Sequence, residues 1–201
     1  MQKKRSVEVV KREPLYQGFF SAERLQLRHE LFQGGMSPVI SREVMFKRAA
    51  AGVLPYDPNT EEVCLIEQFR IGAYAAGQEG WLLEIIAGYL ENDENGEMMV
   101  RREAMEEAGL VLGRVEHVVD VLLSPASCSE QFSLYLAEAD LRTAGGIHGL
   151  ASEGENIRVE VMSLDQAWQA ACNQRIGNAP ALLALQSLML QRDRLRQRWR
   201  R

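Results

Sequence analysis

Alternating apolar and polar residues characterise the N-terminal part of the chain, which indicates β-strands with one buried face. Valines within 7–10 predict a strand that ends before Pro14, and leucines within 25–31 predict a second strand. Residues 39–46 read as a third strand. We expect residues 1–48 to form a small antiparallel β domain. A sheet this small needs a surface to pack on, either its own domain body or a partner subunit.

The pattern after residue 48 mixes strands with helices. A hairpin is predicted from strands at 49–54 and 63–70, joined by a loop that contains Pro55 and Pro58. Residues 71–80 read as a connecting loop. Further strands are predicted at 82–87, 115–123, 132–137 and 157–162, with polar loops at 124–130 and 140–156. Helices are predicted at 97–108, after the capping box Ser163-x-x-Gln166, and from Asn178-x-Pro180. Because strands and helices interleave without regular βαβ alternation, an α+β fold with a mixed sheet is favoured.

Acidic residues concentrate on the helix predicted at 97–108, which follows turn residues at 92–96. At about 100° per residue, Glu103, Glu106 and Glu107 fall within one arc of roughly 100°. Carboxylates on one helix face repel each other unless a cation lies between them. Hard cations such as Mg²⁺ take oxygen ligands of this kind. The two readings at this point are a cation site and a solvated acidic face.

The composition limits the class of protein. The chain has 201 residues, 46% of them hydrophobic, and a net charge of −5, which fits one domain, or one domain with a small appendage, and gives no general attraction to nucleic acid. Residues 191–201 carry six Arg and one Asp. This basic end suits a helix C-terminus, with binding to RNA or an acidic membrane as the alternative. Three widely spaced cysteines and no signal or membrane segment predict a cytoplasmic protein without disulfides.

The spacing G-x5-E-x7-R-E-x-x-E-E-x-G-L over residues 88–110 resembles the Nudix box of the Nudix hydrolase family. Ala104 departs from the pattern, which prefers a larger aliphatic residue there. The resemblance implies a Nudix-type α/β/α sandwich over residues 49–201. Three further stretches resemble the bacterial ADP-ribose pyrophosphatase branch: Leu15-Tyr16-x-Gly18-Phe19-Phe20 with Arg42-Glu43 further on, Ser124-Pro125, and residues 146–159. Pro125-Ala-Ser-Cys stands where Pro-Gly-Gly-Thr is usual in that branch.

The resemblance also implies the metal and catalytic groups. Mg²⁺, with Mn²⁺ as an alternative ion, would be held by the Ala87 carbonyl, Glu103, Glu106, Glu107 and Glu155. Water would attack a phosphorus of the diphosphate, and Glu153 would take its proton, with Glu155 as the alternative base. Glu103 and Glu107 are catalytic through the metal. Glu94 and Arg102 would form an ion pair that ties the loop to the helix.

The expected substrate is ADP-ribose, hydrolysed to AMP and ribose 5-phosphate. The residues expected to contact it by resemblance are Phe19, Phe20, Arg42, Glu43, Lys47, Arg70, Tyr89, Ser124, Pro125, Ala126 and Glu130. Two alternatives remain open. One is a pyrophosphatase for another nucleoside diphosphate sugar such as GDP-mannose, and the other is a non-catalytic nucleotide-binding regulator. The resemblance further implies a homodimer with exchanged N-terminal strands, and neither nucleic acid nor membrane is an expected partner.

Overall fold

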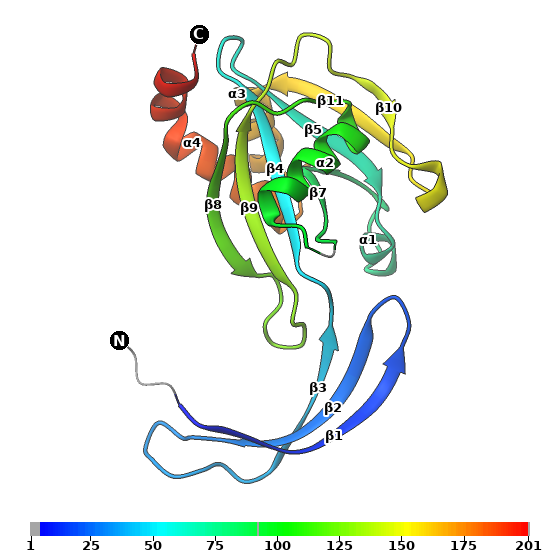
Figure 1. Ribbon diagram of the computed structural model, residues 1–201, viewed down its shortest axis with the longest axis vertical. Helices are drawn as coiled ribbons and strands as arrows, with labels where there is room; N and C mark the ends of the chain where they lie inside the picture. The colour runs from blue at the N-terminus through cyan, green and yellow to red at the C-terminus, as the bar shows by residue number, and fades with distance from the viewer. Residues whose placement is uncertain (1–4, 92, 201) are drawn as a thin grey trace. The chain divides into compact units, whose positions relative to one another are not determined.

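The computed structural model describes residues 5–91 and 93–200, so Asn92 of the predicted turn lies outside the described residues. The chain separates into two compact units (Figure 1). One unit contains the described residues up to Ala49 together with Leu122–Gln131. The other contains Ala50–Val121 and the described residues from Phe132 onward. The two units are described in turn.

The first unit is a three-stranded antiparallel sheet in the order β1-β2-β3. Its strands are β1 (Val7–Gln17), β2 (Ser21–His29) and β3 (Ile40–Phe46). The prediction that the first strand ends before Pro14 is wrong, because β1 continues through it. Proline lacks an N–H group and is tolerated on an edge strand or at an irregularity. Both conditions hold, since β1 is an edge strand whose register shifts between Pro14 and Tyr16.

This first unit has no hydrophobic core of its own. Among its described residues, only Ser37 is buried. Several apolar side chains stay exposed, including Val7, Val9, Val10, Leu15 and Phe32. The segment Leu122–Gln131 joins the unit through backbone hydrogen bonds from Met45 N to Ser127 O (2.8 Å) and from Ser129 N to Met45 O (2.9 Å). A small sheet that buries so little apolar surface is marginal alone.

The second unit is built on an eight-stranded mixed sheet. The strands run in the order β10-β11-β5-β4-β9-β8, with β6 paired to β5 and β7 paired to β4. Their bounds are β4 (Ala50–Asp57), β5 (Glu62–Phe69), β6 (Trp81–Glu84), β7 (Ile86–Tyr89), β8 (Val115–Leu122), β9 (Gln131–Glu138), β10 (Gly146–His148) and β11 (Ile157–Ser163). Strands β4 and β9 are parallel, whereas β5 pairs with β6 and β11 in antiparallel fashion. The predicted mixed sheet is confirmed.

Helices cover both faces of this sheet (Figure 1). Successive side chains of β5 point to opposite faces of the sheet and contact different helices. Cys64 and Ile66 pack with α2 (Gly96–Ala108) in one core cluster. Val63 and Leu65 pack with α3 (Leu164–Cys172) and α4 (Ala179–Trp199) in the other. This confirms the predicted α/β/α sandwich.

The predicted helix boundaries follow from their capping residues. The Asn95 side chain accepts a hydrogen bond from Met98 N at the start of α2, and Gly109 ends it with a φ of 63°. Ser163 and Gln166 form the predicted capping box of α3, and the Asn178 side chain caps α4. No helix within the described residues is both long and apolar enough to cross a membrane.

Four local predictions were wrong. Pro55 lies inside β4, at the point where β4 changes partner from β7, paired up to Val53, to β5, paired from Tyr56. The strand predicted at 82–87 is two strands, because the chain changes from β5 to β4 as its partner at the buried Ile85. The predicted loops at 71–80 and 140–156 contain short ordered pieces: α1 (Ile71–Ala75), β10 and the 3₁₀ turn η1 (Ala151–Glu153).

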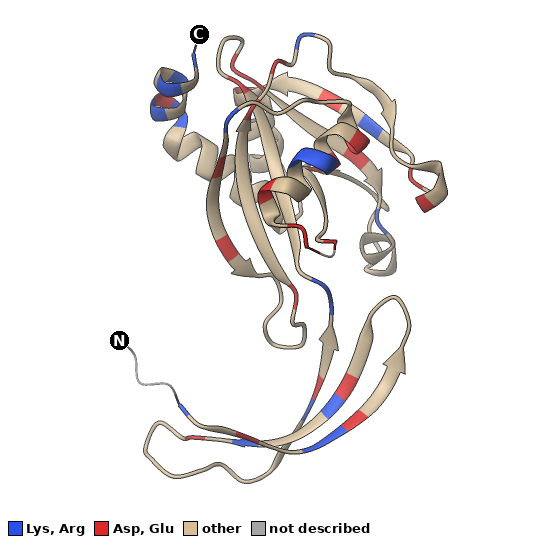
Figure 2. Cartoon of the chain, viewed as in Figure 1, with Lys and Arg blue, Asp and Glu red and all other residues tan. Residues whose placement is uncertain are grey.

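The arginines of α4 have partners within the second unit. Figure 2 shows them along the last turns of the helix. Arg192 pairs with Glu61 and Asp165, and Arg194 and Arg198 both pair with Glu116. These ion pairs attach the end of α4 to the β4–β5 turn, to α3 and to β8.

Candidate functional site

Helix α2 directs its carboxylates toward the end of β7. Glu107 is 2% exposed, and its Oε2 accepts a hydrogen bond from Ala87 N at 3.1 Å. Glu103 lies against Gly88, where an added Cβ would overlap the Glu103 carboxylate. The glycine is therefore required by the close approach of a side chain to the strand backbone. The helix and strand together hold two carboxylates beside the Ala87–Gly88 peptide.

Arg102 binds the acidic groups around this pair. Its Nε and Nη2 donate to the two oxygens of Glu94, each at 3.0 Å, which ties the preceding loop to the helix. Its Nη1 donates to Glu103 Oε1 at 2.8 Å and to Glu106 Oε2 at 3.0 Å. The guanidinium thus has carboxylate partners on both sides, and they raise its pKa. Arg102 has no role left for a substrate in this arrangement.

The buried carboxyl groups have perturbed pKa values. Burial raises the pKa of Glu107 to about 8, with repulsion from Glu103 as the next cause. Burial also raises the pKa of Glu103, although the neighbouring Arg102 opposes the change. The charge of Glu155 raises both pKa values, which places Glu155 within electrostatic range of the pair. The site therefore holds more negative charge than its own cations neutralise.

The loop after β10 is attached to α2 at its C-terminal end. Gly149 N donates to Glu106 O at 3.3 Å, and a Cβ on Gly109 would lie 3.0 Å from Cε1 of the His148 ring. Within this loop the carboxylate of Glu155 accepts a hydrogen bond from Leu150 N at 3.0 Å. Glu153 is exposed on the turn η1. The loop thus carries one carboxylate fixed by a hydrogen bond, that of Glu155, and one exposed carboxylate, that of Glu153.

The donor set fits a divalent cation. Buried carboxylates with raised pKa values, one backbone carbonyl and a further loop carboxylate are oxygen ligands of the type that Mg²⁺ takes. Within the described ranges, no group of three or more His, Cys, Asp or Glu side chains has metal-binding geometry. Glu103 and Glu106 both accept hydrogen bonds from Arg102. An ion would have to compete with that guanidinium for Glu103.

The residues predicted to contact substrate fall in both units. Arg70 and Tyr89 belong to the second unit, which also holds the carboxylates. The others belong to the first unit: Phe19, Phe20, Arg42, Glu43, Lys47, Ser124, Pro125, Ala126 and Glu130. In that unit Phe19 is 81% exposed, whereas Phe20 packs on Tyr16 with ring centroids 5.2 Å apart. Lys47 and Glu130 are joined by an ion pair of 2.6 Å.

Two polar residues on the α2 face of the sheet were missed by the sequence reading. Glu84 on β6 accepts a hydrogen bond from Arg70 Nε at 2.7 Å. Gln68 on β5 is 6% exposed, and its Nε2 has no hydrogen-bond partner. Glu84 interrupts the apolar run Leu-Leu-Glu-Ile-Ile of a predicted buried strand. A charged residue at such a position indicates a side chain with a specific partner or function.

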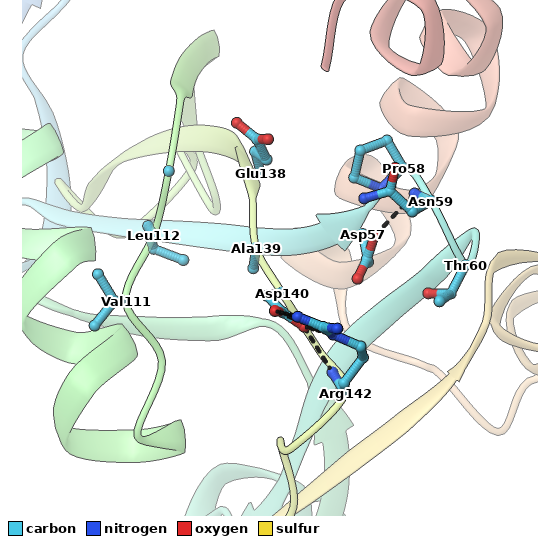
Figure 3. A pocket seen from close by; sticks show the side chains of 11 residues that line it. Asp57, Pro58, Asn59, Thr60, Val111, Leu112, Glu138, Ala139, Asp140 and Arg142 are labelled. Atoms are coloured by element: carbon cyan, nitrogen blue, oxygen red, sulfur yellow. Dashed lines mark hydrogen bonds and ion pairs between the residues drawn. The ribbon is translucent and has the colours of Figure 1, made fainter. Parts of the chain in front are cut away.

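A separate cavity of about 460 Å³ lies beyond the C-terminal end of β4 (Figure 3). Asp57 on its wall lies five residues after Gly52, the partner of Ala87, which is about 16 Å along the strand. The charged groups that line the cavity already have partners. Asp140 pairs with Arg142 at 2.5 Å, Glu138 pairs with Arg114 at 2.8 Å, and Asp57 accepts from Asn59 N at 2.8 Å. This cavity offers no free charge to a ligand.

Comparison with known proteins decides the family. Residues 46–183 match the family model described as the NUDIX domain. The chain belongs to the Nudix hydrolase family. The "ADP-ribose pyrophosphatase" of Escherichia coli K12 is 47% identical over 196 residues, which cover 98% of this chain and 94% of that relative. Residues 88–110, which match the Nudix box in spacing, lie inside the matched domain.

Two further proteins are similar to this chain at lower sequence identity. The "GDP-mannose pyrophosphatase" of Klebsiella pneumoniae is 31% identical over 188 residues, covering 91% of each chain. A crystal structure named "ADP compounds hydrolase" superposes with a TM-score of 0.71 at 18% identity, and covers 98% of this chain and 96% of the other. That structural likeness concerns the fold, including the small N-terminal sheet.

Proposed function

We propose that this Nudix hydrolase splits the diphosphate of ADP-ribose to give AMP and ribose 5-phosphate, with Mg²⁺ as its cofactor. The observation that carries the proposal is the pair formed by the buried Glu107 and the partly buried Glu103 beside the Ala87–Gly88 peptide, on a helix with the family's spacing. The 47% identity to a protein named for ADP-ribose supports this substrate over others. Mn²⁺ is an alternative ion, since it takes the same oxygen ligands.

Each residue of the site has a part in this chemistry. The Ala87 carbonyl, Glu103, Glu106, Glu107 and Glu155 would hold the cation, which activates water and neutralises charge on the phosphate oxygens when bound. Glu153 takes the proton of the attacking water; its exposed place on the turn η1, two residues before Glu155, supports this role. Glu94 holds Arg102, and Arg102 orients Glu103 and Glu106.

The substrate contacts we propose are those of the sequence analysis. Phe19, whose side chain is 81% exposed, would stack on the adenine. The set is completed by Phe20, Arg42, Glu43, Lys47, Arg70, Tyr89 and the segment Ser124-Pro125-Ala126 with Glu130. Lys47 and Glu130 act as a pair because their ion pair joins the end of β3 to that segment.

A second candidate substrate is GDP-mannose, favoured by one feature. Pro125-Ala-Ser-Cys lacks the two glycines of the ADP-ribose branch, and this restricts the backbone. We expect kcat/KM to be at least about 10-fold higher for ADP-ribose, equivalent to about 1.4 kcal/mol. The measurement is a comparison of phosphate-ester products from both substrates at equal enzyme concentration. A higher kcat/KM for GDP-mannose overturns the substrate, whereas tight binding of ADP-ribose without turnover would favour the non-catalytic regulator.

We propose a homodimer with exchanged N-terminal strands. The support is that the first unit buries no apolar residue among those described, while Val7, Val9, Val10 and Leu15 stay exposed. A second chain would cover this surface. Sedimentation equilibrium is expected to give twice the chain mass of 22.7 kDa. A monomer at micromolar concentration would contradict the exchange.

We also place the protein in the cytoplasm. The support is that Cys64, Cys128 and Cys172 are all free, and burial raises the pKa of the Cys64 thiol to about 12, which keeps it unreactive.

A further inference from the structure

Arg70 at the end of β5 is held firmly by its backbone. Its N–H donates to Gly80 O at 2.7 Å, and its carbonyl accepts from Ala73 N at 3.1 Å and Tyr74 N at 3.2 Å at the start of α1. These bonds fix the Cα–Cβ direction, so the position of the guanidinium depends on the side chain alone.

The side chain of Arg70 lies on the α2 face of the sheet. Cys64 and Ile66 pack against α2, and residues at even positions of the strand share their face. Glu84 is the cross-strand partner of Ile66 in the antiparallel β5–β6 pair, which puts it on the same face. The positive charge of Arg70 also lowers the pKa of Glu107. Arg70 is therefore within electrostatic range of Glu107.

The contact between Arg70 and Glu84 uses only one edge of the guanidinium. Arg70 Nε donates to Glu84 Oε2 at 2.7 Å, and neither Nη atom has a hydrogen-bond partner among the described residues. The Arg70 side chain is 41% exposed and that of Glu84 is 14% exposed. Arg102, by contrast, has partners on each of its nitrogens. Arg70 thus presents an unused pair of Nη groups on the α2 face of the sheet.

We propose that Glu84 is a positioning residue that holds Arg70 by its Nε, so that both Nη groups face the diphosphate of the substrate. Without Glu84, the long arginine side chain samples several rotamers and loses this geometry. Two parallel N–H donors match two oxygens of a phosphate group. The Glu84 carboxylate does not touch the substrate and acts through Arg70. The inference rests on the proposed function, since it assigns the diphosphate to Arg70.

The test is a double-mutant cycle with Glu84→Gln and Arg70→Ala. We expect Glu84→Gln to lower kcat/KM for ADP-ribose about 10-fold and Arg70→Ala about 100-fold, within the usual range for a charge-assisted hydrogen bond. Added to Arg70→Ala, Glu84→Gln should have no further effect, because its only route is lost. If the role of Glu84 is purely structural, the fold-losses in kcat/KM of the two single variants multiply in the double variant, and that result would overturn the inference.

The matched control is Glu67→Gln. Glu67 is on the same strand pair and also pairs with an arginine, Arg158, but it lies on the opposite face of the sheet from Ile66 and Gln68. We expect kcat/KM to change less than about 2-fold in this variant. Equal losses in Glu67→Gln and Glu84→Gln would mean that the strand pair, and not Arg70, carries the effect.

A second readout separates this inference from the proposed function. The dissociation constant for ADP-ribose is measured in EDTA, by calorimetry, for the same four proteins of the cycle. Non-additive weakening of binding supports the role of Glu84 whether or not the wild type turns over ADP-ribose. Hydrolysis by the wild type with additive effects on binding refutes the role of Glu84 and leaves the function intact.

Discussion

Glu107→Gln is expected to lower kcat for ADP-ribose by about a thousand-fold, and Glu103→Gln to cause a similar loss. Loss of about 4 kcal/mol of charge stabilisation at the phosphate corresponds to such a factor. The amide preserves the shape of the side chain, so the hydrogen bond from Ala87 N, 3.1 Å long in the wild type, can persist to its oxygen. The measurement is a single-turnover rate at saturating Mg²⁺. Near-normal rates in either variant would refute the metal-site assignment.

The same Glu107→Gln variant should be more stable than the wild type in EDTA. The pKa of Glu107 is raised from 4.5 to about 8 in the folded protein, so its ionisation opposes folding. This penalty is absent below pH 4.5 and grows as the pH rises toward 8. Calorimetry at pH 7.5 is therefore expected to show a Tm several degrees higher for the variant, and at pH 4.5 no difference. An unstable variant would mean that lost activity reports misfolding.

Glu97→Gln provides the matched control on the same helix. Glu97 is in the first turn of α2, and its exposed carboxylate pairs with Arg101 at 2.8 Å. An exposed pair of this kind contributes little to stability. We expect its kcat and Tm to stay close to those of the wild type. A large loss of activity in this variant would show that any charge change on α2 is harmful.

Glu153→Gln is expected to lower kcat by about 10²–10⁴-fold with little change in KM, the range for loss of a general base. Glu153 is exposed on the turn η1, so the change should leave stability unaffected. The measurement is kcat and KM for ADP-ribose at constant Mg²⁺, and a near-normal kcat would refute Glu153 as the base.

Glu155→Gln distinguishes the two loop carboxylates. Glu155 is fixed by a hydrogen bond from Leu150 N and is within electrostatic range of Glu103 and Glu107. We expect this variant to require a higher Mg²⁺ concentration for half-maximal activity, with a kcat at saturating Mg²⁺ closer to that of the wild type than in Glu153→Gln. If Glu155→Gln instead loses kcat at saturating Mg²⁺ and Glu153→Gln keeps it, the base is Glu155.

Helix α2 could be predicted closely from the sequence because the residues that begin and end it lie within or next to it in the chain. Asn95, the run without Pro or Gly, and Gly109 determine its ends within a few residues. The exchange of strand partners at Ile85 and Pro55 could not be predicted in this way. Which distant strands pair depends on which surfaces meet in the fold. Neither the hydrophobic periodicity of a segment nor its strand propensity predicts its partner.

The candidate site shows the same limit. The spacing of Glu103, Glu106 and Glu107 indicates that they share one helix face, but it does not predict how deeply each is buried. Glu107 is 2% exposed, whereas Glu106 is partly exposed and forms an ion pair with Arg102. The contact between Arg70 and Glu84 joins residues 14 apart on separate strands. This contact depends on the pairing of β5 with β6, which the sequence pattern does not predict.

The most direct test of the proposed reaction is hydrolysis of ADP-ribose with Mg²⁺ in ¹⁸O-water, with mass spectrometry of the products. The expected result is AMP and ribose 5-phosphate with one ¹⁸O in a single product, and no product in EDTA. The labelled product identifies the phosphorus that water attacks. No cleavage of ADP-ribose at saturating Mg²⁺, or equal cleavage in EDTA, would contradict the account.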